Sequence, residues 1–270
     1  MARDFSIYEK ELSRMQGRDN RRSSGGANDY TWLTTDKPSK TGDQTRQRLR
    51  IVPRRSQDGT IHDEFWVSVD QHILKVDGKT KVMVCPDNHD DPNGAKVCPL
   101  CKLSRELYAS REPEYLSIAK ELSTRVRVFA NVINVDDTGA HVDDKPMIWA
   151  FSRTIHNALL DICVAKRAFI EDPEVGRDIL LTTRRIGPNR IDIRYAVTDM
   201  DPAPVDPSLM NIVNNAHDLE SLAKSADLDE LREIAAQQDP RAAGSVSYHQ
   251  PEVAAPTPAA PAPAYRPEVA

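Results

Sequence analysis

The stretch FWVSVDQHILKVDGKTKVMVC (65–85) decides the local fold, because it holds two strand patterns around one turn. Apolar and polar residues alternate on both sides of Asp77-Gly78, a dipeptide typical of tight hairpin turns. A two-residue loop makes His72 and Cys85 diagonal neighbours, whereas a four-residue loop places them directly opposite each other. In both registers the imidazole and the thiol lie roughly 5–8 Å apart on one face of the hairpin, close enough to share a metal ion.

The segment that follows the hairpin, PDNHDDPNGAKVCPLC (86–101), adds the other ligands. Cys98 and Cys101 form a CxxC knuckle, a spacing that lets two sulfurs converge on one tetrahedral ion. No βαβ pattern of the kind found around redox-active CxxC motifs surrounds it. With Cys85 as the third ligand, the fourth metal ligand is one of two histidines. We predict one structural Zn2+ held by His72, Cys85, Cys98 and Cys101, with His89 as the alternative to His72; four protein ligands leave no open position for catalysis.

Strand and helix patterns alternate along the chain up to about residue 200. The segment after the knuckle is helical with a break at Pro113, and a second helix pattern covers 153–169. We expect an α+β, mainly β fold, an OB-fold-like Greek-key barrel with an inserted zinc-binding subdomain and flanking helices. A generic α+β domain is the alternative. Strand patterns occur at 30–33, 47–53, 64–76, 81–85, 125–135, 146–151 and 178–199.

Charge is distributed unevenly along the 270 residues, although the net charge is only −5. The first 56 residues contain 13 basic and 7 acidic side chains, and residues 201–270 contain 4 basic and 11 acidic ones. Such asymmetry indicates a nucleic-acid surface at one end and an acidic segment at the other. We expect an N-terminal basic arm and linker (1–29), a core (30–198) with the zinc subdomain at about 66–122, an acidic helical segment (199–239) and a Pro/Ala-rich disordered tail (240–270).

Arginines and aromatic residues recur together in the strand patterns. Arg46, Arg48 and Arg50 alternate along one predicted strand, so they share a face and form a cationic stripe. Arg125 and Arg127 repeat the pattern beside Phe129. Cations for phosphates and flat rings for bases are what sequence-independent binding of single strands requires. The alternatives are a solvated strand edge for the arginines and core packing for each aromatic ring.

The sequence resembles a family, the zinc-containing single-stranded DNA-binding (helix-destabilising) proteins of T-even-type bacteriophages. The thirteen-residue step from His72 to Cys85, followed by a CxxC knuckle, is similar to the family's zinc pattern and favours His72 over His89. The Cys85–Cys98 loop is longer than is usual there. Over about 30–198, LRIVPRR (49–55), FANVINVDD (129–137) and IWAFSRTIHNAL (148–159) also resemble family segments. The resemblance implies that DNA is contacted by Arg50, Tyr108, Tyr115, Trp149 and Phe151.

The resemblance implies a sequence-independent single-stranded DNA-binding protein, not an enzyme, that acts in phage DNA replication, recombination and repair. It implies binding to further copies of itself along the strand, contacts of the acidic segment with replication and recombination proteins, and location in the cytoplasm of the infected bacterial host. No run of roughly eighteen apolar residues predicts a membrane span, and the charged N-terminus does not predict a signal peptide. The alternatives are a zinc-ribbon protein–protein interaction module and a metal-dependent nuclease; no P-loop, GxSxG or HExxH motif favours catalysis.

Overall fold

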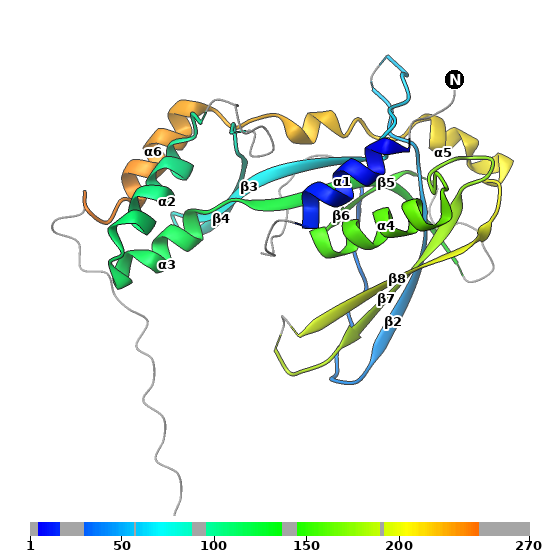
Figure 1. The fold of residues 1–270 in the computed structure, drawn as a ribbon, viewed down its shortest axis with the longest axis horizontal. Coiled ribbons are helices and arrows are strands. Elements are labelled where there is room, and N and C mark those ends of the chain that lie inside the picture. Colours follow the sequence, from blue (N-terminus) through cyan, green and yellow to red (C-terminus); the bar gives the residue numbers. More distant parts are fainter. Residues whose placement is uncertain are drawn as a thin grey trace, which may run out of the picture.

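A mixed sheet of eight strands forms the centre of the described structure (Figure 1). The computed structural model describes residues 5–16, 30–56, 58–87, 96–136, 145–189 and 192–242, so most of the predicted linker and tail lie outside these ranges. The fold is α+β, as predicted. The strands are β1 (Trp32–Leu33), β2 (Gln44–Ile51), β3 (Trp66–Val76), β4 (Lys79–Val84), β5 (Arg125–Val135), β6 (Met147–Phe151), β7 (Arg177–Arg185) and β8 (Ile193–Pro202).

Strand β5 is the branch point of the sheet. Its residues 125–130 pair with β3 and its residues 132–135 pair with β2, while β6 pairs along the other edge. Strand β2 continues to β7 and β8, and β1 lies beside β6 in the one parallel pairing of the described sheet. β3 is long enough to pair with β5 through its first half and with β4 through its second half. The β3–β4 hairpin therefore extends beyond the main sheet.

The described ranges contain six helices. Helix α1 (Ser6–Gln16) packs on α4 (Arg153–Lys166), and Tyr8 of α1 is fully buried against Phe65 and Trp66. Its hydroxyl donates to the buried carboxylate of Glu171, at 3.2 Å from Oε1. None of the described helices is long and apolar enough to cross a membrane. The helices are α1 (Ser6–Gln16), α2 (Pro99–Ser110), α3 (Pro113–Leu122), α4 (Arg153–Lys166), α5 (Met210–Asn214) and α6 (Leu228–Gln238), with two 3-10 turns, η1 (Pro207–Leu209) and η2 (Glu220–Ala223).

The acidic segment (199–239) is helical only in short pieces. Its first residues complete β8, and η1, α5, η2 and α6 follow with breaks between them. In Figure 1 this yellow-to-orange segment runs along the sheet from α5 to α6 beside α2. Leu219 is buried against Phe129 and neighbouring apolar residues of the sheet, and the Asn131 side-chain amide donates to the carbonyl of His217 at 2.8 Å. The segment therefore contributes to the core as well as to the acidic charge.

The β3–β4 hairpin turns through two residues, Asp77 and Gly78. Val76 pairs with Lys79, and both turn residues have positive φ (50° and 73°), as a type I′ turn requires. His72 consequently pairs with Met83, so His72 and Cys85 are diagonal neighbours. The structure thus selects the shorter of the two loops that the sequence left open.

Replacing Gly78 by alanine should lower the free energy of unfolding by about 1–2 kcal/mol, because an L side chain is strained at positive φ. A Cβ at this position would meet no atom within 4 Å, so the cost comes from the backbone alone. Urea unfolding of Gly78→Ala measures it. Lys79→Ala, at the exposed next residue, is the control and should be nearly neutral. Equal stability of Gly78→Ala and the native chain would contradict the turn type.

Candidate metal centre

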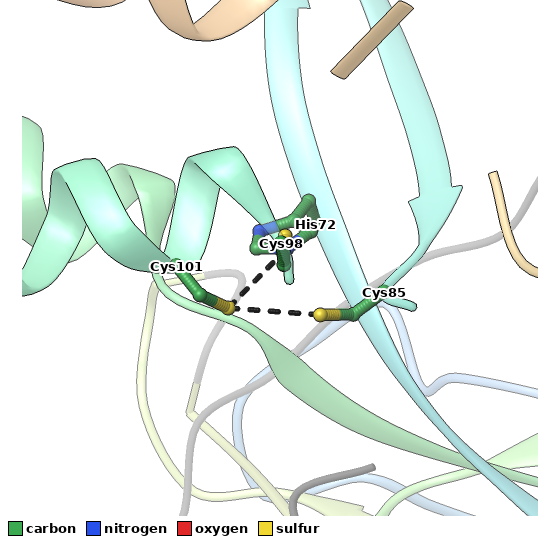
Figure 2. Close-up of side chains that lie close together, drawn as sticks. All are labelled: His72, Cys85, Cys98 and Cys101. Atoms are coloured by element: carbon green, nitrogen blue, oxygen red, sulfur yellow. Dashed lines mark hydrogen bonds between the residues drawn. The ribbon is translucent and has the colours of Figure 1, made fainter. Parts of the chain in front are cut away.

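Four side chains converge between the β3–β4 hairpin and the start of α2 (Figure 2). His72 lies in β3, and Cys85 follows the last residue of β4. Cys98 is the N-cap of α2 and Cys101 lies in its first turn. Pro99 at the first helical position fits this start, because its fixed φ suits a helix and its missing N–H would have no intrahelical partner there. The helix start thus brings both knuckle sulfurs to the hairpin.

The four potential ligand atoms all lie within 4.8 Å of one another. His72 Nε2 lies 3.2 Å from Cys98 Sγ and 3.6 Å from Cys101 Sγ, and Cys85 Sγ lies 3.6 Å from Cys101 Sγ (Figure 2). All four residues are buried, with at most 7% of any of them exposed. The four residues are therefore positioned to bind one metal ion, as the sequence predicted.

Two neighbouring groups hold the ligands in place. The carbonyl of Leu122, at the end of α3, lies 2.7 Å from His72 Nδ1, so the Nδ1–H can donate to it and leave Nε2 free to face the sulfurs. The carboxylate of Asp87 accepts the backbone N–H of Cys98 at 2.8 Å, and Asp87 is only 2% exposed. Outer contacts of this kind fix the tautomer and the direction of metal ligands.

The three thiols strongly affect one another's protonation. The pKa of Cys98 lies far below its usual value, because the side chains of Cys101 and Cys85 hydrogen bond to its sulfur. The pKa of Cys101 is raised, most by its hydrogen bond with Cys85 and next by its hydrogen bond with Cys98. A buried thiolate without a countercharge is costly. A bound cation would remove this conflict, since metal ligation requires deprotonated sulfurs.

Apolar side chains surround the site on several sides. The hairpin, α2, α3 and α6 contribute to a single buried cluster, so the C-terminal helix covers the same subdomain as the metal ligands. The predicted range of the subdomain, about 66–122, did not include α6. The cluster contains Leu74, Met83, Leu100, Leu103, Leu107, Ala119, Leu122, Leu231 and Ile234 beside the three cysteines.

The competing histidine, His89, lies outside the described residues. His72 itself is fully buried and faces the sulfurs of Cys98 and Cys101. The position that the sequence assigned to a fourth ligand is therefore filled by His72 in this structure.

Comparison with family models and with curated proteins found no relative. No protein-family model matches the chain, and no curated protein matches it closely enough to count as related. Function is therefore inferred from the site, from the surface charges and from the sequence resemblance described above.

The predicted arginine stripe of β2 lies on one face, but its members differ in exposure. Arg46 is exposed, whereas Arg48 is half-buried and forms an ion pair with Asp178 at 2.6 Å. Arg50 is 3% exposed and binds the same carboxylate as well as the carbonyls of Asp172 and Ala203. Burial lowers the pKa of Arg50, and the charge of Asp178 opposes this effect. Only Arg46 of the three is available to a ligand without rearrangement.

The predicted contacts near the subdomain are partly accessible. Tyr108 on α2 is 38% exposed, while Tyr115 on α3 is half-buried against the apolar cluster. Arg125 and Arg127 begin β5 and are both half-buried. Burial lowers the pKa of Arg127. As DNA contacts these four residues remain predictions.

The three remaining predicted contacts are in the interior. Phe129 and Phe151 are each 2% exposed, and Trp149 is fully buried. Trp149 and Phe151 lie in the main core with their ring centroids 4.5 Å apart, and Phe129 packs against Trp32 on the opposite face of the sheet. Core packing, the alternative reading of these aromatics, describes their contacts in this structure.

Two surface arginines that the sequence analysis did not select lie on the same face as Arg46. Arg184 of β7 and Arg194 of β8 are exposed and pair directly with each other. The sequence offered a signal for them, because TTRRIGPNRIDIR (182–194) carries arginines on both sides of Gly187-Pro188. Only the strand register shows which of them share a face.

Proposed function

We propose that this protein binds single-stranded DNA without sequence preference and that a structural zinc ion braces its binding surface. The observation that carries the proposal is the buried site of one histidine and three cysteines, formed from a motif that resembles the zinc pattern of phage single-stranded DNA-binding proteins. Exposed arginines on the neighbouring sheet supply the cationic surface that such binding needs.

The distances at the site favour zinc. In a tetrahedral site with Zn–S bonds of about 2.3 Å, sulfurs lie about 3.8 Å apart and a histidine nitrogen lies about 3.6 Å from each sulfur. The corresponding distances here are 3.6 Å between Cys85 and Cys101 and 3.2–3.6 Å from His72 to the two knuckle sulfurs. Thiolates also select zinc over magnesium, calcium or manganese. With four protein ligands and an apolar surround, the ion would stabilise the subdomain and not catalyse a reaction.

The proposal includes a partly open barrel of the OB type for the main sheet. Its support is the branching of β5, which pairs with β3 and then β2 along one edge and with β6 along the other. Such a change of partner bends a sheet and is expected in a small Greek-key barrel.

DNA binding would combine two kinds of contact. Exposed guanidinium groups such as that of Arg46 neutralise phosphates, and Tyr108 offers a partly exposed ring for base stacking on the zinc subdomain. The proposal extends to copies that bind side by side along the strand. It also assigns the acidic segment (199–239) as the contact for replication and recombination proteins.

Two rival functions are less well supported. A zinc-ribbon module would use its own surface to recruit a protein, but α6 of the same chain already packs on this subdomain through Leu231 and Ile234. A metal-dependent nuclease needs open positions on its metal, and four buried protein ligands leave none.

Titration of fluorescent oligo-dT at several salt concentrations tests the proposal. We expect binding that weakens steeply as salt increases, because each phosphate contact releases a counterion, and little difference between single-strand sequences. A mixed-sequence single strand and a duplex are the comparison ligands. Absence of binding at low salt would contradict the proposal, and strand cleavage in the presence of magnesium would favour the nuclease.

A further inference from the structure

The strands β2, β7 and β8 form an arm whose outer face carries three exposed arginines: Arg46, Arg184 and Arg194. Register places them on one face. Arg46 pairs with Thr182, Arg184 lies two residues further along β7, and Arg184 pairs with Arg194. The same face of β2 continues to Arg48 and Arg50, which meet Asp178 of β7.

This arginine face is open to solvent. In Figure 1 the ends of β2, β7 and β8 extend beyond α4 and away from α2, α3 and α6. The intervening side chains on the face are small or short: Thr182 is half-buried, and Ala196 and Thr198 are exposed. A ligand that lies flat on the sheet could therefore touch all three guanidinium groups without moving any part of the described fold.

The arrangement of charge is unfavourable without a ligand. Like charges directly opposite each other in an antiparallel pair destabilise it, and Arg184 faces Arg194 in this way. Arg46, Arg184 and Arg194 form no ion pair with an acidic group of the described ranges, whereas Arg48 and Arg50 further along the face share Asp178. A polyanion would supply the missing counter-charges.

We propose that this arginine face of the arm binds the phosphate backbone of single-stranded DNA. The inference rests on the proposed function and adds Arg184 and Arg194 to its phosphate contacts. No aromatic residue of the described arm lies on this face, since Tyr195 pairs with Thr183 on the other one. The face therefore contributes phosphate contacts without base stacking, which suits binding that ignores sequence.

The test replaces the three arginines together, as Arg46→Gln/Arg184→Gln/Arg194→Gln, and measures oligo-dT affinity against salt. Each lost phosphate contact should make the slope of log affinity against log salt about 0.7 less negative, or about 2 for three contacts. Extrapolated to about 0.1 M salt, this corresponds to roughly ten- to hundredfold weaker binding. The matched control is Arg46→Lys/Arg184→Lys/Arg194→Lys, which keeps the charges at the same positions and should retain most of the affinity and slope.

The outcomes separate this inference from the proposed function. If the native protein does not bind oligo-dT, the proposed function fails. If the native protein binds oligo-dT and the glutamine variant binds it with the same affinity and salt slope, the arginine face does not contact DNA. Only this inference is then overturned. Equal loss in the lysine and glutamine variants, with lowered melting temperatures, would also overturn it, because damage to the fold would then explain the result.

Discussion

Cys98→Ala should abolish metal binding and unfold the zinc subdomain, the largest effect that we expect from any single substitution. Cys98 is fully buried, and its sulfur lies 3.2 Å from His72 Nε2. In small zinc domains the metal contributes on the order of 10 kcal/mol of apparent binding free energy, so losing a ligand should cost several kcal/mol of stability. Bound zinc per chain, measured by elemental analysis, should fall from one to near zero, and limited proteolysis should cut between about residues 72 and 122. Prolonged chelation of the native protein should give the same cleavage pattern.

Cys163 provides the matched control, because it is equally buried but lies in the main core, away from the site. Burial raises the pKa of its thiol, as expected for an inert thiol in an apolar core. Cys163→Ala should therefore retain one zinc per chain and resist proteolysis of the subdomain. Retention of zinc by Cys98→Ala, or its loss from Cys163→Ala, would show that the ligand assignment is wrong. His72→Ala should behave like Cys98→Ala, which separates His72 from His89.

The local patterns of the sequence predicted many strand limits correctly, and they selected the four potential metal ligands that the structure brings together. The strand pattern at 125–135 matches β5, and the limits of the strand pattern at 178–199 match the start of β7 and the end of β8 to within a few residues. The spacing of His72, Cys85, Cys98 and Cys101 was sufficient because hairpin register and helix start are both set by nearby residues. The choice between two loop lengths needed the backbone of Asp77 and Gly78, and the choice of His72 over His89 as the fourth ligand needed the position of His72 beside the knuckle sulfurs.

The sequence was less informative wherever contacts between distant segments decide the outcome. Nothing near Tyr8 indicates that its ring lies against Trp66, or that α1 packs on α4. The acidic segment (199–239) was predicted to be helical, but its apolar residues pack on the sheet and on the zinc subdomain at separate places, and its helices are short pieces. Alternation likewise placed Arg46 and Arg50 on one face correctly, yet could not show that Asp178, 128 residues away from Arg50, pairs with only one of them.

The ion pair of Arg50 gives the second large expected effect. Asp178→Ala should lower the free energy of unfolding by about 3–5 kcal/mol, because it leaves a buried guanidinium without its countercharge. Arg50 keeps its bonds to the carbonyls of Asp172 and Ala203, but these carry no full charge. Urea unfolding monitored by tryptophan fluorescence measures the loss. Arg48 shares the carboxylate but is 17% exposed at its side chain and can turn to water, so Arg50 accounts for most of the cost.

The double variant Arg50→Met/Asp178→Ala tests what the pair does. Removing both charges should recover much of the stability lost in Asp178→Ala, since a buried pair is often no more stabilising than apolar residues of similar volume. If Arg50 serves the fold, the double variant should also keep the salt slope of the native protein for oligo-dT. Suppose instead that the slope of log affinity against log salt becomes about 0.7 less negative while the stability stays native-like. Arg50 would then be a phosphate contact, as the sequence resemblance implies. Unfolding and salt titration together thus show whether Arg50 holds β2 to β7 or binds DNA. The position of Arg50 in the arginine stripe could not distinguish these two roles.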